Sequence, residues 1–216
     1  MLSNPKNAIW EAFLLTGVVF VIGLLLGISY ENGKIDQINE YYADSEISLT
    51  DIMAMNKIID TKNLSCEVLI DSNLGFADKI YEEVRLLEKY EDSGKISDGM
   101  KLAHKKYDLL RTFLWVNSGE TLKRCRNFSV VVYLYEYESD DLIQKANQNV
   151  WSKVLYDLKQ DVGRDIILIP IAVDSNLTSL NSLVGRFDIE SFPAVIINDK
   201  NVLTKLSSVE EIKKYL

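Results

Sequence analysis

The first pattern along the chain is a single uninterrupted apolar run. Residues 12–29 carry no charge, and at about 1.5 Å rise per residue the stretch 9–30 is long enough to cross a hydrocarbon layer of roughly 30 Å. Trp10 and Tyr30 bracket it, as interfacial aromatic residues do. We therefore expect an uncleaved, single-pass anchor after an N-terminal tail of residues 1–8. The alternatives are a cleaved signal peptide, although no A-x-A site follows the run, and a buried core helix.

The flanks of this anchor bear on its topology and on its partners. Lys6 and the terminal amine precede the span and Lys34 follows it, which slightly favours a cytoplasmic amino terminus. We therefore expect the anchor in the cell membrane and the rest of the chain outside the cytoplasm, with the lipid bilayer as one partner. Gly23 and Gly27 have the spacing that lets two membrane helices approach closely, so a homodimer through them is one hypothesis. Lipid-facing glycines without a partner are the alternative.

The second pattern, over residues 31–126, is apolar spacing of the helical kind without any proline. It predicts helices over about 33–43 and 48–59, and then an antiparallel helical hairpin over about 65–126 that turns at 92–97. The positions expected to face each other are Cys66, Ile70, Asn73, Ala77, Ile80, Val84 and Leu87 in the first arm, and Ala103, Tyr107, Leu110, Leu114, Ser118, Thr121 and Cys125 in the second.

The two cysteines lie at equal distances from this turn. Cys66 lies 28 residues before Gly94 and Cys125 lies 28 residues after Ser97, so equal arms place both at the open end of the hairpin. A disulfide there would close a loop of about 60 residues and stabilise the fold by on the order of 4 kcal/mol, provided that the helix ends converge. Because the chain carries a membrane anchor, we favour the disulfide. Two buried free thiols are the alternative.

The third pattern begins after Arg126, where β-branched and aromatic runs alternate with helical segments. The strands are expected at about 129–137, 165–174, 192–197 and 202–206, and the helices at about 140–160, 177–186 and from the capping box Ser208 to Glu211 onward. The first two strands should be parallel and the last two an antiparallel hairpin, with Pro170 at a sheet edge or bulge. The apolar face expected for the first of these helices is Leu142, Ile143, Ala146, Val150, Val154, Leu155 and Leu158. Residues 127–216 therefore form an α/β domain of order β-α-β-α-β-β-α.

This order resembles the thioredoxin fold over about the last 90 residues. The tyrosine-rich first strand runs into a helix where that family has its active site, and residues 171–193 look like the family's pattern leading to its cis-proline, whose place Pro193 takes. The whole chain also resembles membrane-anchored, helix-plus-thioredoxin-like proteins of prokaryotes. The resemblance implies a thioredoxin-like α/β domain after a helical hairpin region and one transmembrane helix.

The sequence departs from that family at the position of its C-x-x-C motif. The corresponding residues are Ser139-Asp140-Asp141-Leu142, and neither Ser139 nor Leu142 can supply the thiolate that disulfide exchange requires. Cys125 lies just before the first strand, at the wrong end to replace the missing thiol. This departure from the thioredoxin motif implies a thioredoxin-like domain without redox activity.

Composition excludes several other functions. A net charge of −8 argues against a general nucleic-acid binder, and one histidine with two cysteines is too few for the usual zinc site. His104 is expected on the exposed side of the hairpin. The carboxylates of Glu136, Glu138, Asp140 and Asp141 are better explained as solvated groups near a helix amino terminus than as a metal site. We predict no metal, no cofactor and no catalytic residue.

These patterns favour a binding or scaffolding module for a peptide or protein partner. The resemblance implies that backbone groups beside Phe192 and Pro193, with the 139–142 loop nearby, would pair with an extended peptide. The alternative is an enzyme, a thiol–disulfide oxidoreductase in which Cys66 and Cys125 are the working pair. A third interpretation is a purely structural membrane anchor.

Overall fold

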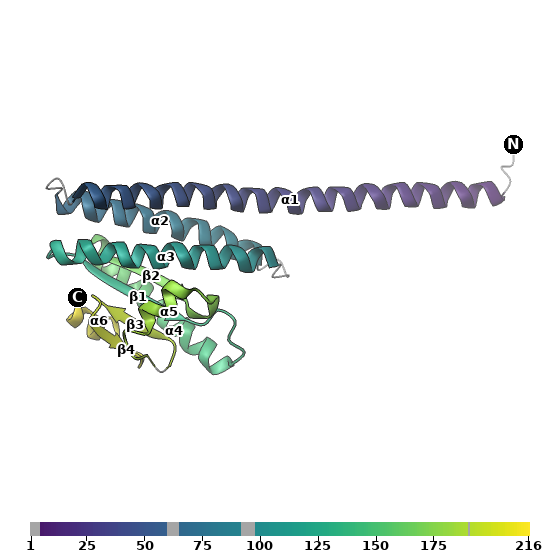
Figure 1. The fold of residues 1–216 in the computed structure, drawn as a ribbon. Coiled ribbons are helices and arrows are strands. Elements are labelled where there is room, and N and C mark those ends of the chain that lie inside the picture. Colours follow the sequence, from purple (N-terminus) through teal and green to yellow (C-terminus); the bar gives the residue numbers. More distant parts are fainter. Residues whose placement is uncertain (1–4, 60–64, 92–97, 190) are drawn as a thin grey trace. The chain divides into compact units, whose positions relative to one another are not determined.

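The computed structural model describes residues 5–59, 65–91, 98–189 and 191–216 (Figure 1). Its helices are α1 (Pro5–Ile59), α2 (Cys66–Glu91), α3 (Asp98–Arg124), α4 (Leu142–Val162), α5 (Thr178–Val184) and α6 (Val209–Ile212), and its strands are β1 (Ser129–Tyr135), β2 (Ile166–Ala172), β3 (Ala194–Ile197) and β4 (Asn201–Leu203). The chain divides into two compact units, with the boundary inside α1 between Tyr41 and Tyr42. Each unit is described by itself.

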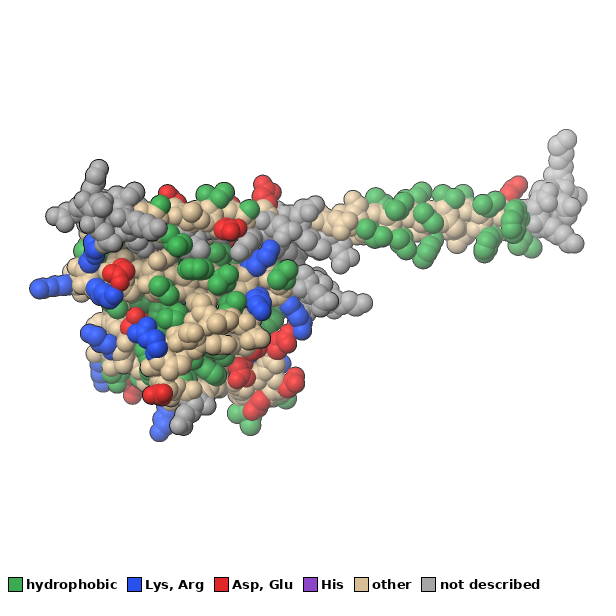
Figure 2. Space-filling view, viewed as in Figure 1, with side chains coloured by type: hydrophobic (Ala, Val, Ile, Leu, Met, Phe, Trp, Pro, Cys, Tyr) green, Lys and Arg blue, Asp and Glu red, His purple; other side chains and the backbone are tan. Residues whose placement is uncertain are grey.

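The first unit contains the apolar part of α1. The segment Ile9–Tyr30 has a mean hydropathy of 2.5 and none of it is buried, and Figure 2 shows its apolar side chains on the surface. Inside it, the Thr16 hydroxyl donates to the Ala12 carbonyl at 2.8 Å, so this polar group is satisfied within the helix. Length and composition therefore suit a membrane span, as the sequence predicts.

The prediction of separate helices over 33–43 and 48–59 is wrong, because α1 continues without a break to Ile59. A single glycine such as Gly33 costs only about 1 kcal/mol inside a helix, and no proline interrupts the segment. The Thr50 hydroxyl donates to the Glu46 carbonyl at 2.9 Å, the bond of a residue in the helix interior.

In the second unit, α2 and α3 form the predicted antiparallel hairpin. All the positions predicted to face inward on the second arm, from Ala103 to Cys125, are buried. On α2 the prediction is right for Asn73, Ile80 and Val84, whereas Ile70 and Ala77 are half-buried and Cys66 is exposed. The side chain of Leu87 and the turn at 92–97 lie outside the described residues. Leu69, Leu74 and Phe76 are buried as well, because α2 packs against β2 in addition to α3.

A buried polar network fixes how the two arms align. The side-chain amide of Asn73 donates to the Leu69 carbonyl at 2.9 Å and to the Thr121 hydroxyl at 3.0 Å. The Ser118 hydroxyl donates to the amide oxygen of Asn73 at 3.4 Å. Because an unpaired buried amide is costly, sliding one arm past the other by a helical turn would be penalised.

The strands form one mixed sheet in the order β2-β1-β3-β4. Strand β1 runs parallel to β2 and antiparallel to β3, and β3 and β4 form an antiparallel hairpin, as predicted. Pro170 lies in the edge strand β2, where its missing N–H breaks no bond to a neighbouring strand. Asn198 and Asp199 supply the positive φ angles, 53° and 54°, of the tight turn between β3 and β4.

Helices cover both faces of this sheet. Helices α4 and α6 enclose the main core on one face, formed by Val131, Tyr133, Trp151, Leu155, Leu158, Ile166, Val195, Ile197 and Ile212. Helix α3 packs on β1 and β2 from the other face, where it also meets α5. There the Trp115 indole donates to the Asp199 carboxylate at 2.7 Å and its ring stacks on Phe187. The hairpin is therefore one layer of the α/β unit.

The burial of α3 predicts a large asymmetry between two neighbouring positions. Leu114 is 1% exposed and Val116 is 52% exposed. In the full chain in detergent, Leu114→Ala should lower the free energy of unfolding by about 2–5 kcal/mol, because it removes buried methyl groups and leaves a cavity. The control Val116→Ala should stay within about 0.5 kcal/mol of wild type. Equal effects in denaturant titrations would show that this face of α3 is not packed on α2.

Candidate functional site

The residues predicted to contact a peptide lie at the carboxyl end of β1. Strand β1 ends at Tyr135, and its antiparallel register pairs Leu134 with Ala194 at the start of β3. The preceding Phe192–Pro193 peptide bond is cis, and Pro193 is buried while Phe192 is half-buried. Residues 136–141 leave the sheet at the carboxyl end of β1, where β3 begins. The topology therefore brings the segments 139–142 and 192–193 to the same end of the sheet.

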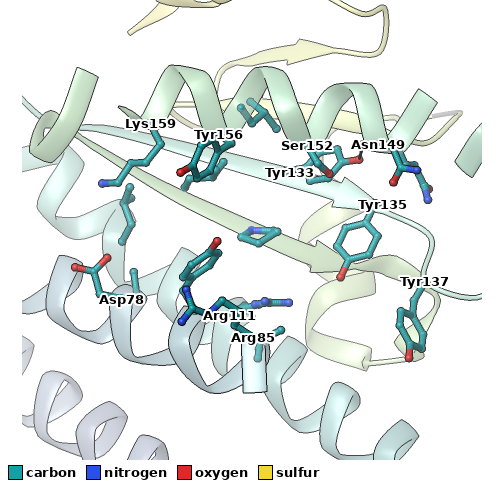
Figure 3. Close-up of a pocket in the computed structure, with 18 of the residues that line it drawn as sticks. Asp78, Arg85, Arg111, Tyr133, Tyr135, Tyr137, Asn149, Ser152, Tyr156 and Lys159 are labelled. Carbon is teal, nitrogen blue, oxygen red and sulfur yellow. Dashed lines mark hydrogen bonds between the residues drawn. The ribbon is translucent and has the colours of Figure 1, made fainter. Parts of the chain in front are cut away.

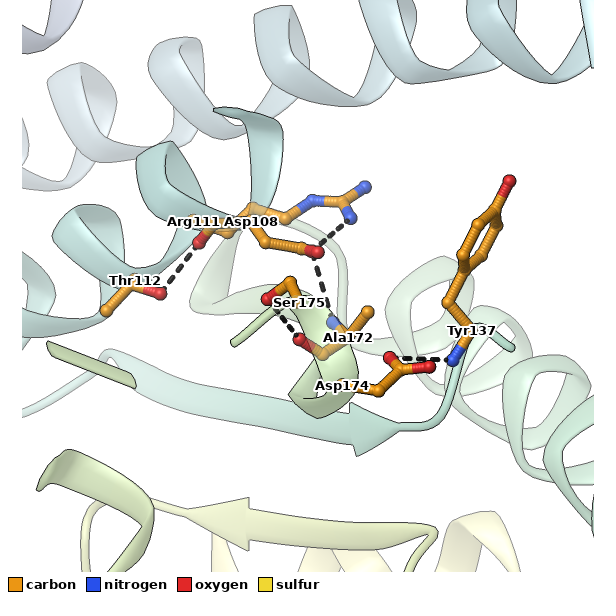
Figure 4. Close-up of polar contacts among 7 residues, drawn as sticks. All are labelled: Asp108, Arg111, Thr112, Tyr137, Ala172, Asp174 and Ser175. Atoms are coloured by element: carbon orange, nitrogen blue, oxygen red, sulfur yellow. Dashed lines mark hydrogen bonds and ion pairs between the residues drawn. The ribbon is translucent and has the colours of Figure 1, made fainter. Parts of the chain in front are cut away.

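Two side chains hold the loop that leaves β1. The Gln148 amide oxygen accepts from the Glu136 N–H at 2.9 Å, and its amide nitrogen donates to the Glu136 carbonyl at 3.0 Å. The Asp174 carboxylate accepts from the N–H groups of Tyr137 and Glu138 at 3.0 and 2.7 Å. Figure 4 shows Asp174 reaching Tyr137 from the segment after β2. The loop is therefore fixed to α4 and to the end of β2.

The residues that stand in the place of a C-x-x-C motif build the start of α4. Ser139 is buried; its hydroxyl donates to the Gln144 side-chain oxygen at 2.7 Å and accepts from the Asp141 N–H at 3.3 Å. Asp141 is the N-cap and accepts from the N–H groups of Ile143 and Gln144 at 2.8 and 3.4 Å. Asp140 is exposed. Ser139 and Asp141 therefore accept hydrogen bonds from backbone N–H groups at the start of α4.

The predicted inward face of α4 is wrong for Leu142, Ile143, Ala146 and Val150, which are exposed, and right for Leu155 and Leu158. Leu142 and Ile143 are 78% and 80% exposed, and the helix buries Gln148 and Trp151 instead. Gln148 pairs with Glu136 just beyond the carboxyl end of β1. The residues of α4 before Gln148 therefore extend beyond the ends of the strands and have no strand to pack against. The result is an exposed apolar pair, Leu142 and Ile143, beside the held loop.

Helix α3 reaches the same loop from the other side. The His104 ring packs on the Tyr137 ring with centroids 4.3 Å apart, and Lys101 forms an ion pair with Glu138. His104 is half-buried rather than exposed as predicted, because α3 lies on the sheet. Within the described parts of the chain, no three His, Cys, Asp or Glu side chains gather as a metal site would require.

A buried charge pair joins α3 to β2 close to this edge (Figure 4). Asp108 is 2% exposed; its carboxylate accepts from the Ala172 N–H at 3.1 Å and lies 3.5 Å from the Arg111 guanidinium. Burial raises the pKa of Asp108 to about 6, although Arg111 and the Ala172 bond oppose the shift. Asp108 thereby occupies an outward-facing N–H at the carboxyl end of the edge strand.

A groove of about 770 Å³ opens beside the edge strand, between α2 and α4 (Figure 3). Its floor includes Leu168 and Pro170, and tyrosines line it from α2, β1, α4 and the loop after β1. No local sequence pattern indicates this groove, because its walls come from segments that lie far apart along the chain. The only sequence signal is the concentration of tyrosine in the first strand.

Two of the groove's polar side chains are already engaged in the fold. The Tyr133 hydroxyl donates to the Gln148 carbonyl at 3.0 Å, its ring stacks on Tyr135, and burial raises the pKa of Tyr133 to about 12. The Lys159 ammonium donates to the carbonyls of Gly163 and Ile166 at 2.9 and 2.7 Å, and burial lowers the pKa of Lys159. The Tyr133 hydroxyl and the Lys159 ammonium are therefore bonded within the protein and are not available to a ligand.

Cys66 and Cys125 come together at disulfide distance, with Cα atoms 5.6 Å apart. Cys66 is exposed at the first turn of α2, and Cys125 is buried just before β1. This confirms that the cysteines meet at the open end of the hairpin. Because β1 separates Cys125 from the loop at 136–141, the pair lies at the opposite end of the strand from the predicted peptide site.

Comparison of the chain with protein-family models, with curated proteins and with solved structures gives no match. The class of protein is therefore defined by its own architecture: one N-terminal helix that is long and apolar enough to span a membrane, and an α/β unit with a four-stranded mixed sheet.

The Asp108 carboxyl should make stability depend on pH with a particular sign. Its pKa is about 6 when folded against an ordinary value near 3.8, so the folded state binds the proton more tightly. Its contribution is therefore most favourable below about pH 4 and is lost as the pH rises through 6.

We expect the free energy of unfolding of wild type to fall by about 1–3 kcal/mol relative to Asp108→Asn between pH 4 and pH 7. Denaturant titrations of both full-length proteins in detergent across this range measure the difference. Parallel profiles would show that Asp108 is not a buried carboxylate.

Proposed function

We propose that this chain is a membrane-anchored binding module whose thioredoxin-like domain has no redox activity. The element order β-α-β-α-β-β-α, the sheet order β2-β1-β3-β4 and the cis peptide bond before Pro193 support the thioredoxin-like assignment. The apolar segment Ile9–Tyr30 supports the anchor. The disulfide-distance cysteine pair supports a location of the α/β unit outside the cytoplasm, where disulfides persist.

The observation that carries this proposal is the chemistry of the residues at the carboxyl end of β1. Where a redox enzyme needs an exposed thiolate, the chain has a buried Ser139 bonded to Gln144 and then the exposed pair Leu142 and Ile143. Two adjacent, largely solvated apolar side chains on a rigidly held helix end are unfavourable in water and favour a partner that covers them. The partner is a peptide in extended conformation, bound between this pair and the backbone at Phe192.

A homodimer through Gly23 and Gly27 is compatible with this proposal. A Cβ atom added at either glycine would meet nothing within 4 Å, so both positions are open on the helix surface. Peptide binding at the carboxyl end of β1 does not depend on this homodimer.

The second candidate function is thiol–disulfide exchange through Cys66 and Cys125. One observation favours it: Cys66 is exposed, so the thiolate of another molecule could attack its sulfur. The two functions make opposite predictions about turnover.

We expect the full-length protein in detergent to show no thiol-dependent turnover when it is supplied with a reductant and a disulfide-containing protein substrate. The rate should equal that of the Cys66→Ser/Cys125→Ser double variant and of the buffer blank. A rate above the blank that the double variant loses would support the oxidoreductase and contradict our proposal.

Peptide binding provides the direct test. An array of extended apolar and mixed peptides, probed with the detergent-solubilised full chain, should contain ligands whose affinity falls at least tenfold in the double variant Leu142→Asp/Ile143→Asp. Burial of two such side chains contributes on the order of 3 kcal/mol or more, so their loss should be visible.

The matched control for this array is Val150→Asp, at a 46% exposed position of the same helix, which should bind as wild type does. An array without ligands would contradict the proposal. So would equal binding by wild type and by the double variant that replaces Leu142 and Ile143.

A further inference from the structure

The groove between α2 and α4 lies beside the edge strand β2, and its lining does not include Leu142, Ile143 or Phe192. Its volume, about 770 Å³, lies in the range of small-molecule sites, roughly 300–1,000 Å³. Five tyrosines line it, and its charged side chains are four cations against two carboxylates. This cationic excess stands out in a chain whose net charge is −8.

The charges differ in how far the fold already uses them. Lys159 binds two carbonyls and lies near Asp78, so that end of the groove is locally compensated. Arg85 on α2 and Lys145 on α4 are exposed and line facing walls. Arg111 is buried, and its guanidinium lies 3.5 Å from the Asp108 carboxylate.

These three cations lie away from the compensated end. In Figure 3, Asp78 and Lys159 are at one end of the groove and Tyr135 and Tyr137 at the other, with Arg85 between them. Lys145 precedes Asn149 by one turn of α4, and Asn149 lies toward the Tyr135 end. Glu136, the groove's second carboxylate, follows Tyr135 in the chain and so belongs to this half, where three cations of the lining stand against it. An anionic group here would meet Arg85 on the α2 wall and Lys145 on the α4 wall.

The remaining lining suits an aromatic body. The rings of Tyr133 and Tyr135 are stacked with centroids 5.5 Å apart, and Tyr135 is only half-buried. Leu168 and Pro170 supply an apolar floor. Tyrosine rings hold a planar apolar group with little loss of side-chain entropy.

An added peptide strand fits this groove less well. Alternate residues of a strand direct their backbone groups to the same edge, so Ile166, Leu168, Pro170 and Ala172 face away from β1. The Ile166 carbonyl is taken by Lys159 and the Ala172 N–H by Asp108, while Pro170 has no N–H. Little of the edge is left for a strand to pair with.

We infer that this groove binds a small aromatic carboxylate, with its anionic group between Arg85 and Lys145 beside Arg111 and its ring against the tyrosines. This site goes beyond the proposed function, since it needs neither the exposed pair at 142–143 nor the cysteines. An aromatic ligand here would pack on α2, β2 and α4 together.

Photo-crosslinking with two matched probes tests the inference. The probes are 4-benzoylbenzoate, which is anionic, and 4-benzoylbenzamide, which has the same aromatic body without the charge. With the full-length protein in detergent, the carboxylate should label peptides of α2 and α4 saturably, and its half-saturating concentration should be at least tenfold below that of the amide. Mapping by mass spectrometry separates this labelling from insertion of either probe beside the apolar span at 9–30.

Variants identify the charges responsible. Arg85→Gln/Lys145→Gln should raise the half-saturating concentration of the carboxylate about tenfold and leave that of the amide unchanged. Lys153→Gln, at an exposed position of α4 outside the groove lining, is the matched control and should behave as wild type. Leu142→Asp/Ile143→Asp should also label as wild type, which separates this site from the peptide site. Equal labelling by the two probes, labelling confined to the apolar span, or unchanged labelling of the Arg85→Gln/Lys145→Gln variant would each overturn the inference.

Discussion

The burial of α3 on two sides is the constraint on which the rest of the α/β unit depends. One side of the helix packs on α2 through residues such as Leu110 and Leu114. The other side packs on β1 and β2, where Asp108 accepts from the Ala172 N–H, and reaches the β3–β4 turn, where the Trp115 indole donates to Asp199. These two bonds satisfy polar groups that the packing buries. Hairpin and sheet are thereby joined into one layered structure.

This packing also explains where the candidate sites lie. Because α3 covers one face of the sheet, α2 is held beside the edge strand β2, and the groove is the space left between α2 and α4. The loop after β1 is held from three sides, by Gln148, by Asp174 and by the ring of His104 against Tyr137. The loop is therefore held by contacts from three elements, which suits binding by preformed contacts.

Several features could be predicted from sequence because they depend on local patterns. The apolar segment Ile9–Tyr30, the antiparallel arms with their cysteines at the open end, and the order of strands each follow from residues close together in the chain. The Ser208 and Glu211 capping box is likewise present with both of its bonds. The sheet-edge segments at 139–142 and 192–193 were found through the resemblance to thioredoxins, and whether they bind a peptide stays a prediction.

What the sequence by itself determined is the type and order of the elements, since hydrophobic period, caps and turns act over a few residues. Only the tertiary structure decided which face each helix presents. Leu142 and Ile143 have the apolar character of core residues, yet they are exposed because Gln148 fixes where α4 meets the end of β1. His104 is polar and yet half-buried, because α3 lies on the sheet. The groove, too, exists only in three dimensions, since its walls come from α2, α3, α4, β1 and β2, whose spacing no local pattern sets.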